Sequence, residues 1–174
     1  MKGREYLAVI FLVLLAALGS DRRPLTAQTP PSPPVVGVWR VVTVETVRPN
    51  GEVLTDWLGK RPTGTIAYLP SGYMAVQIMK DPRPLIAGGG YGAATAEEKV
   101  AAIDGYYAYY GTYEVNMATK TVVHQIAASL RPNEVGIRYE RHFEISGERL
   151  TLTTPPSTRA GEQRFNRLVW ERIK

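Results

Sequence analysis

The sequence predicts an all-β fold, an eight-stranded antiparallel up-and-down barrel with one short helix. Short segments rich in β-branched and aromatic residues alternate with Gly, Pro and Asn turns through most of the chain. Eight such segments follow one another with mostly short connections, and a sheet of this kind closes naturally into a barrel without exposed edges. A chain of 174 residues with 44% hydrophobic residues is long enough to bury one sizeable core.

The first 27 residues predict a secretory signal peptide. Lys2 and Arg4 precede an apolar run of 13 residues, 7–19, which is the charged region and then the hydrophobic region of such a signal. The run is shorter than the ~20 apolar residues that a membrane-spanning helix needs, and "LTAQ" offers cleavage after Ala27. We expect a secreted or periplasmic protein with no stable membrane insertion after signal cleavage. The alternative is an uncleaved N-terminal anchor.

A Pro-rich linker is expected over residues 28–35, because "TPPSPP" suits neither a helix nor a central strand. The barrel domain is expected over residues 36–174. Its strands are predicted at 38–47, 64–69, 73–79, 106–115, 121–130, 137–145, 149–154 and 164–173. "PPSTRAGEQ", before the last strand, is expected to form a longer loop.

Residues 81–105, between the third and fourth predicted strands, show no alternation. "TAEEKVAAI" predicts a helix with Thr95 as N-cap and Glu98 completing a capping box, and Val100 and Ile103 could give it an apolar side. The Gly- and Pro-rich loop before it is expected to be lid-like at one end of the barrel. A simple plug or crossover is the alternative.

Strand alternation assigns side chains to the inside or the outside of the barrel. The predicted inner positions are Tyr107, Tyr109, Gly111, Tyr113 and Val115 on the fourth strand, Val122, His124, Ile126 and Ala128 on the fifth, Ile137, Tyr139, Arg141, Phe143 and Ile145 on the sixth, and Leu168 and Trp170 on the last. His142, the other of the two histidines, faces solvent.

The predicted interior is polar and aromatic enough to line a cavity for one small ligand. The candidate ligand-binding residues are His124, Arg141, Tyr107, Tyr109, Tyr113 and Tyr139. Each has a structural alternative. His124 could be a hydrogen-bonded core residue, and the tyrosines could simply pack. Arg141 could form a salt bridge, for which Glu45, assigned to the same face as Trp39, is the candidate partner.

Several kinds of chemistry have no support. There is no cysteine for a disulfide or a thiol nucleophile, and "AGGGYG" lacks the Lys-Ser/Thr of a P-loop. Neither a Gly-x-Ser-x-Gly elbow nor an inward carboxylate pair is present. No cofactor or metal is expected. The formal charge of +5 leaves only +3 beyond residue 27, without a basic patch, so no nucleic-acid partner is expected.

The strand segments, taken together and in order, resemble a known family. "GVWRVVTVE" looks like the Gly-x-Trp opening of lipocalins, and "GTIAYLPSGYMAVQIM", "EEKVAAIDGYYAYYGTYEV", "TVVHQIAASLRPNEVG", "RYERHFEISGERLTLTTPP" and "RLVWERI" together are similar to the lipocalin-like domain family of bacteria and fungi. The resemblance implies a calycin-type barrel in which Trp39 packs across the closed end against a basic residue of the last strand, Arg172 or Arg167. The positions that look like family motif are Tyr109, Gly111, Tyr113, His124, Asn133, Arg141 and Trp170.

The resemblance also implies a ligand pocket and leaves any reaction open. We expect a secreted or periplasmic protein that holds a small, mostly apolar molecule. One alternative is a cofactor-independent isomerase or cyclase, in which His124 is the general acid or base and Arg141 stabilises developing negative charge. The other is a structural module with a filled barrel.

Overall fold

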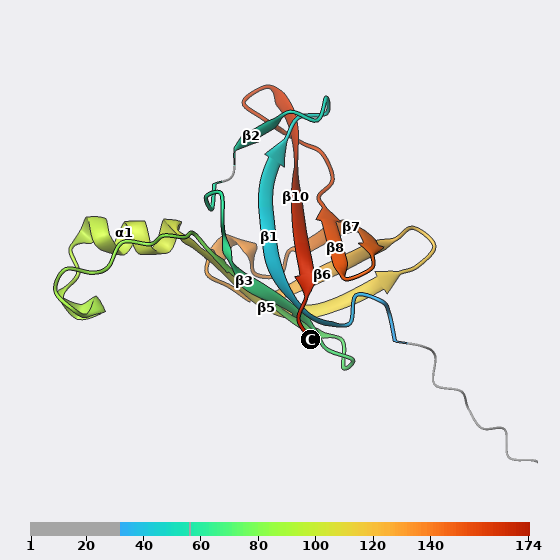
Figure 1. Cartoon of the computed structure of the whole chain (residues 1–174), viewed down its shortest axis with the longest axis horizontal. Helices are drawn as coiled ribbons and strands as arrows, with labels where there is room; N and C mark the ends of the chain where they lie inside the picture. Colours follow the sequence, from blue (N-terminus) through green and yellow to red (C-terminus); the bar gives the residue numbers. More distant parts are fainter. Residues whose placement is uncertain (1–31, 56) are drawn as a thin grey trace, which may run out of the picture. The chain divides into compact units, whose positions relative to one another are not determined.

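The computed structural model, which describes residues 32–55 and 57–174, shows one antiparallel sheet closed into an eight-stranded up-and-down barrel (Figure 1). The barrel strands are β1 (Gly37–Val47), β3 (Thr63–Tyr68), β4 (Tyr73–Met79), β5 (Tyr106–Asn116), β6 (Thr121–Ser129), β7 (Arg138–Ser146), β8 (Arg149–Thr153) and β10 (Glu162–Arg172). Each pairs with the next, and β1 pairs with β10 to close the ring. The predicted fold class is confirmed. The predicted signal peptide and the start of the linker lie outside the described residues and stay predictions.

Two three-residue strands extend the barrel beyond the eight predicted. β2 (Val53–Thr55) pairs with the end of β1, and β9 (Ser157–Arg159) pairs with the start of β10. The sequence did not reveal them, because runs of three residues are too short to show alternation. The expected loop at 155–163 therefore contains a strand and a tight turn at Ala160 and Gly161, both with positive φ.

The helix is α1 (Ala96–Asp104), and two 3₁₀ turns are η1 (Tyr91–Ala93) and η2 (Pro132–Glu134). The predicted capping box is confirmed: the Glu98 N–H donates to Thr95 Oγ1 at 3.2 Å, and the Thr95 N–H donates to Glu98 Oε2 at 2.8 Å. Within residues 32–55 and 57–174, no helix combines the length and the apolar character needed to span a membrane.

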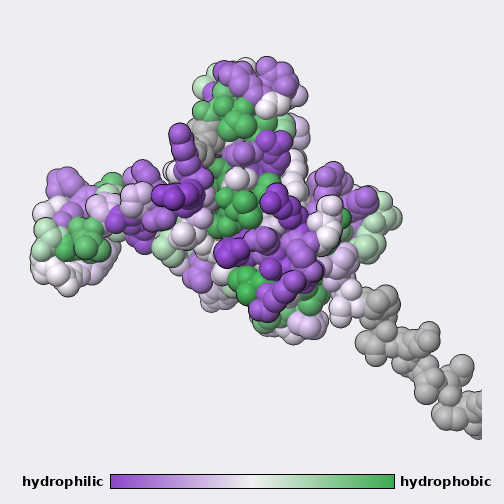
Figure 2. Space-filling view, viewed as in Figure 1, coloured by the Kyte–Doolittle hydropathy of each residue, from purple (hydrophilic) through white to green (hydrophobic). Residues whose placement is uncertain are grey.

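The expected apolar side of α1 does not pack on the barrel. None of its residues is buried, and Val100 and Ile103 are 57% and 50% exposed. Figure 1 shows the segment that carries α1 reaching away from the strands, and Figure 2 shows hydrophobic surface at its far end. The role of a lid stays a prediction.

Side chains alternate between core and solvent in the predicted phase along β5 and β7, and along β6 as far as Ile126. Tyr109 and Tyr113 on β5, Val122 and Ile126 on β6, and Phe143 on β7 are buried. Gly111 lies where β5 and β6 come closest, since a Cβ there would meet the Gln125 carbonyl oxygen at 1.9 Å. This contact explains why glycine occupies an inner position between two tyrosines.

The register of β6 with β5 shifts after Ile126, so Ala128 lies opposite the outward Tyr110. Ile137 precedes β7 and is 41% exposed. The prediction of inner positions is therefore wrong for Ala128 and Ile137.

The alternation of β1 is interrupted, and this corrects the expectation for Glu45. The register with β10 shifts between Val41 and Thr43, so one extra residue on β1 reverses the inward phase. Glu45 therefore faces outward and pairs with Arg167 at 2.7 Å. It is not a partner of Arg141, and no alternation rule could have revealed the bulge.

Trp39 and Arg172 pack against each other and close one end of the barrel. The two residues pair across β1 and β10, and the Arg172 guanidinium lies 3.9 Å from the centroid of the fully buried Trp39 ring. Arg172 also donates to the carbonyl oxygens of Val36 and Pro34 at 2.9 and 3.0 Å. Of the two candidates, Arg172 is thus the partner of Trp39.

Gly37 makes room for this contact. Its φ is +135°, and a Cβ there would lie 2.5 Å from Arg172 Nη1. The glycine of the Gly-x-Trp opening is therefore favoured by its positive φ and by the arginine stacked on the tryptophan.

Arg172→Lys is expected to lower the free energy of unfolding by about 1–3 kcal/mol, because an ammonium loses the flat stacking and cannot make both carbonyl contacts. Denaturant unfolding measures the change. Arg40→Lys is the matched control, since Arg40 forms only an exposed ion pair with Glu171. Equal stabilities for the two variants would contradict the proposed role of Arg172.

Candidate functional site

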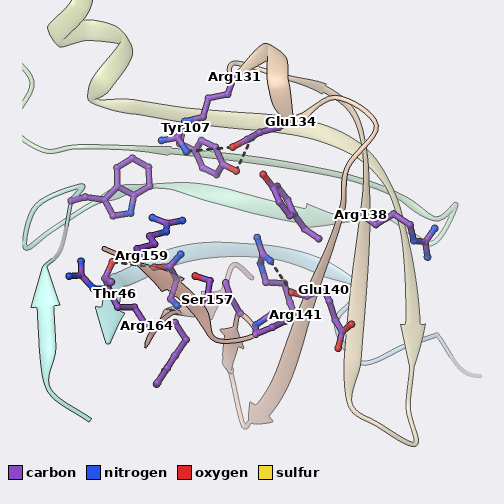
Figure 3. Close-up of a pocket in the computed structure, with 16 residues that line it drawn as sticks. Thr46, Tyr107, Arg131, Glu134, Arg138, Glu140, Arg141, Ser157, Arg159 and Arg164 are labelled. Atoms are coloured by element: carbon purple, nitrogen blue, oxygen red, sulfur yellow. Dashed lines mark hydrogen bonds and ion pairs between the residues drawn. The ribbon is translucent and has the colours of Figure 1, made fainter. Parts of the chain in front are cut away.

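A cavity of about 660 Å³ lies at the end of the barrel where β5, β7 and β10 begin and β1 ends. Its aromatic lining consists of Trp57, Tyr107, Tyr139 and Phe165. Its charged lining consists of Arg131, Arg138, Arg141, Arg159 and Arg164 with Glu134 and Glu140 (Figure 3). The cavity therefore combines flat apolar walls with an excess of positive charge.

One wall is organised by a buried carboxylate, Glu134 on η2. Its Oε2 accepts hydrogen bonds from the hydroxyls of Tyr107 at 3.1 Å and Ser129 at 2.8 Å. Arg131 Nη1 approaches its Oε1 at 3.5 Å. The β6–β7 connection is thereby fastened to the start of β5 and the end of β6, and the charge of Glu134 is compensated within this wall.

Arg131 also stacks on the aromatic part of the same wall. Its guanidinium lies 4.7 Å from the Tyr107 ring centroid and 5.4 Å from that of Trp57. Trp57 and Tyr107 meet edge to face at 5.9 Å. Mutual contact holds these side chains in place at the barrel mouth, so the wall is formed before any ligand arrives.

The next part of the lining comes from β7, where Tyr139 and Arg141 both point inward. The Arg141 guanidinium lies 4.8 Å from the Tyr139 ring centroid, and Arg141 Nη1 donates to the Glu140 carbonyl oxygen at 2.8 Å. Figure 3 shows Arg141 reaching into the space between the strands, whereas Arg138 points away from it. Arg141 is therefore the arginine of β7 that reaches the cavity interior.

A polar layer lies deeper in the barrel, around His124. The imidazole is 1% exposed, and its Nε2 and Nδ1 each lie 2.8 Å from a tyrosine hydroxyl, those of Tyr68 and Tyr109 respectively. A neutral imidazole has one N–H, so one hydroxyl accepts a hydrogen bond from the ring and the other donates one to it. Tyr113 turns toward the closed end and donates to the Leu69 carbonyl oxygen at 2.8 Å.

Burial controls the ionisation of this layer. It lowers the pKa of His124 to about 3, and the charge of Arg141 adds to that effect. Burial raises the pKa of Tyr109 to about 12, and Arg141 works against that rise. Burial, followed by the neighbouring Tyr109 and Glu134, raises the pKa of Tyr107. His124 is therefore a neutral core imidazole at physiological pH.

Three of the six residues predicted to bind a ligand line the cavity: Tyr107, Tyr139 and Arg141. The other three, His124, Tyr109 and Tyr113, lie in the layer beneath, where the Tyr109 ring contacts those of Tyr107 and Tyr139 at 5.5 and 6.0 Å. Ligand contact by any of the six stays a prediction.

Sequence reasoning missed the cavity residues that lie outside regular alternation. Trp57 follows β2, Glu134 lies in a 3₁₀ turn, and Arg159 belongs to a three-residue strand. The available signal was weak: Trp57 is a large aromatic residue in a connecting segment, where a tryptophan needs a packing partner. Within residues 32–55 and 57–174, no group of three or more His, Asp or Glu side chains is placed to hold a metal ion.

The barrel and its mouth cavity define this protein as one of the calycin type. Residues 36–173 match the model of the lipocalin-like domain family, and the chain belongs to that family. Membership of this family suggests small-molecule binding.

A curated relative is the 4'-hydroxy-3'-methoxypropiophenone carrier protein of Aspergillus oryzae. It is 32% identical over 107 residues, which are 58% of this chain and 96% of the relative. No solved structure matches the chain.

Stability is expected to fall in acid because of His124. Its pKa is lowered from 6.5 to about 3 in the folded state. Below pH 6.5, His124 is therefore protonated in the unfolded chain and stays neutral in the folded protein. The contribution of neutral His124 to the free energy of unfolding is fully present above pH 6.5. It falls by about 1.4 kcal/mol per pH unit as the pH falls toward 3. His124→Gln should be less stable at pH 7 and should lack this part of the slope. Denaturant unfolding at several pH values measures both effects.

His142→Gln is the control, because His142 is exposed and lies 3.7 Å from Glu144 on the outer face. It should keep the acid slope of the parent. An unchanged slope in His124→Gln would show that carboxylates alone produce the acid sensitivity.

Proposed function

We propose that this protein is a secreted or periplasmic carrier that holds one small, mostly apolar, aromatic ligand in the mouth of its barrel. The observation that carries the proposal is the cavity of about 660 Å³ with four aromatic side chains in its lining. This volume lies within the ~300–1,000 Å³ of typical small-molecule sites. The flat rings of the lining favour a flat, aromatic ligand body over a flexible chain.

The rigidity of the walls supports binding. Tyr107 is held by Glu134, by Trp57 and by Arg131, and Tyr139 is held between Tyr109 and Arg141. Side chains that are already ordered lose little conformational entropy when a ligand arrives. The buried His124 layer adds to this by fixing Tyr109 under the cavity floor.

The name of the curated relative supports an aromatic ligand. That protein is named as a carrier of a propiophenone with one hydroxyl and one methoxy group, an aromatic ketone small enough for a cavity of this volume. The compound is therefore a suitable first probe.

The proposed compartment rests on residues 1–27, where a short apolar run follows two basic residues. Export from the native host with loss of the first 27 residues is the expected outcome, measured by the intact mass of the protein in the extracellular or periplasmic fraction. A full-length mass in the membrane fraction would favour the uncleaved anchor.

The two alternatives fare differently. The size of the cavity counts against a filled barrel, for which no space above ~300 Å³ is expected. For a cofactor-independent isomerase or cyclase, His124 and Arg141 remain the predicted catalytic pair. No contact of His124 favours that role specifically, because both of its ring nitrogens are taken by tyrosine hydroxyls and the ring is 1% exposed.

Tyr139→Ala is expected to weaken binding of 4'-hydroxy-3'-methoxypropiophenone about tenfold or more, because it removes one flat wall of the cavity. Isothermal titration calorimetry on the folded variant measures the affinity. Tyr110→Ala is the matched control, since Tyr110 lies on the outer face of β5 and is 55% exposed. If neither this compound nor a panel of other small aromatic compounds binds the parent protein, the carrier proposal is wrong.

A further inference from the structure

We infer that the ligand carries an anionic group, such as a carboxylate or an acidic phenol, and that Arg141 binds it while Tyr139 contacts the adjoining ring. This inference rests on the proposed function and specifies the chemical class of the ligand. It starts from the ion pairs around the cavity, which leave part of its positive charge without a partner.

Most charged groups at the cavity are already compensated. Arg164 pairs with Glu162 at 2.7 Å, Arg138 pairs with Glu114 at 3.0 Å, and Arg131 lies 3.5 Å from Glu134. Glu134 has further donors in Tyr107 and Ser129. These side chains form their contacts without a ligand, so they define the walls.

Arg141 and Arg159 differ from the other cavity arginines. Among the residues that the structure describes, no carboxylate forms an ion pair with either of them. Arg159 is exposed at the rim, whereas Arg141 is partly buried. The one hydrogen bond of Arg141 is to the carbonyl oxygen of its chain neighbour, Glu140, which leaves most of the five guanidinium N–H donors available.

A partly buried guanidinium without a counter-charge is unfavourable, and an anion that enters the cavity removes this cost. The flat fork of donors matches the two oxygens of a carboxylate and also serves a single phenolate oxygen. Arg141 already stacks on Tyr139 at 4.8 Å. A ring with an acidic substituent would thus meet the guanidinium with its oxygens and the tyrosine with its face.

The positive field of Arg141 is also felt deeper in the barrel. It lowers the pKa of Tyr109 against the larger effect of burial, and it contributes to the lowered pKa of His124. Glu134 acts on Tyr109 in the opposite direction, but its effect is smaller than that of Arg141. The pKa directions thus agree with the position of Arg141, which carries the inference.

The inference is tested with pairs of ligands that differ only in charge, such as cinnamate and cinnamamide or 4-hydroxy-3-methoxybenzoate and its primary amide. Calorimetry on the parent protein at pH 7 should show the acid binding about tenfold or more tightly than its amide. Because this comparison uses the parent protein, its result does not depend on whether a variant folds.

Arg141→Gln should bring the ratio of acid to amide affinity close to one, with amide affinity little changed. Arg149→Gln is the control for net charge, because Arg149 is exposed at the start of β8, at the opposite end of the barrel. It should keep the ratio of the parent.

Three outcomes would overturn the inference, and they separate it from the carrier proposal. Equal affinity for acid and amide would leave a carrier of neutral ligands. A preference for the acid that survives in Arg141→Gln would assign the anion to another arginine, with Arg159 the first candidate. Failure of every acid and amide, together with the propiophenone, would overturn both proposals.

Discussion

The pairing of β1 with β10 is the interaction on which the rest of the structure depends. It turns a twisted sheet into a closed barrel, and only closure gives each strand an inside and an outside. Trp39 and Arg172, one from each strand, complete the closed end, and Arg172 also holds the chain that enters β1 through the carbonyls of Pro34 and Val36. With one end closed in this way, the cavity lies at the other end of the barrel.

Closure also dictates how polar side chains inside the barrel are satisfied. Most backbone donors and acceptors are used by the strand ladder, so an inward polar group bonds either to another inward side chain or to a carbonyl at a strand end, as Tyr113 does with Leu69. His124 does so with Tyr68 and Tyr109, and Glu134 does so with Tyr107 and Ser129. The inward tyrosines suit this need, because a tyrosine supplies both an apolar ring for packing and a hydroxyl for hydrogen bonding.

Alternation along the chain was enough to predict the strand order, most of the inner faces of β5 to β7, and the inward positions of Arg141 and His124, although a bulge in β6 turns Ala128 outward. It failed at Glu45, because the bulge near Val42 reverses the phase of β1 and leaves no mark in the pattern of residue types. Alternation also says nothing about how deeply an inward side chain is buried in the barrel. His124 and Arg141 are equally inward by alternation, yet one is 1% exposed and the other reaches the cavity. Seven of the sixteen lining residues come from connections and from a three-residue strand, where periodicity carries no information.

The difference in depth follows from the chemistry of the two side chains. An imidazole can give up its proton, so His124 tolerates full burial by remaining neutral between two hydroxyls. A guanidinium stays charged at any physiological pH and cannot use that solution. Arg141 therefore has to lie where water, or a ligand, can reach it, and the mouth of the barrel is such a place. The position that makes its charge tolerable is also the one from which, in our proposal, Arg141 binds the anionic group of the ligand.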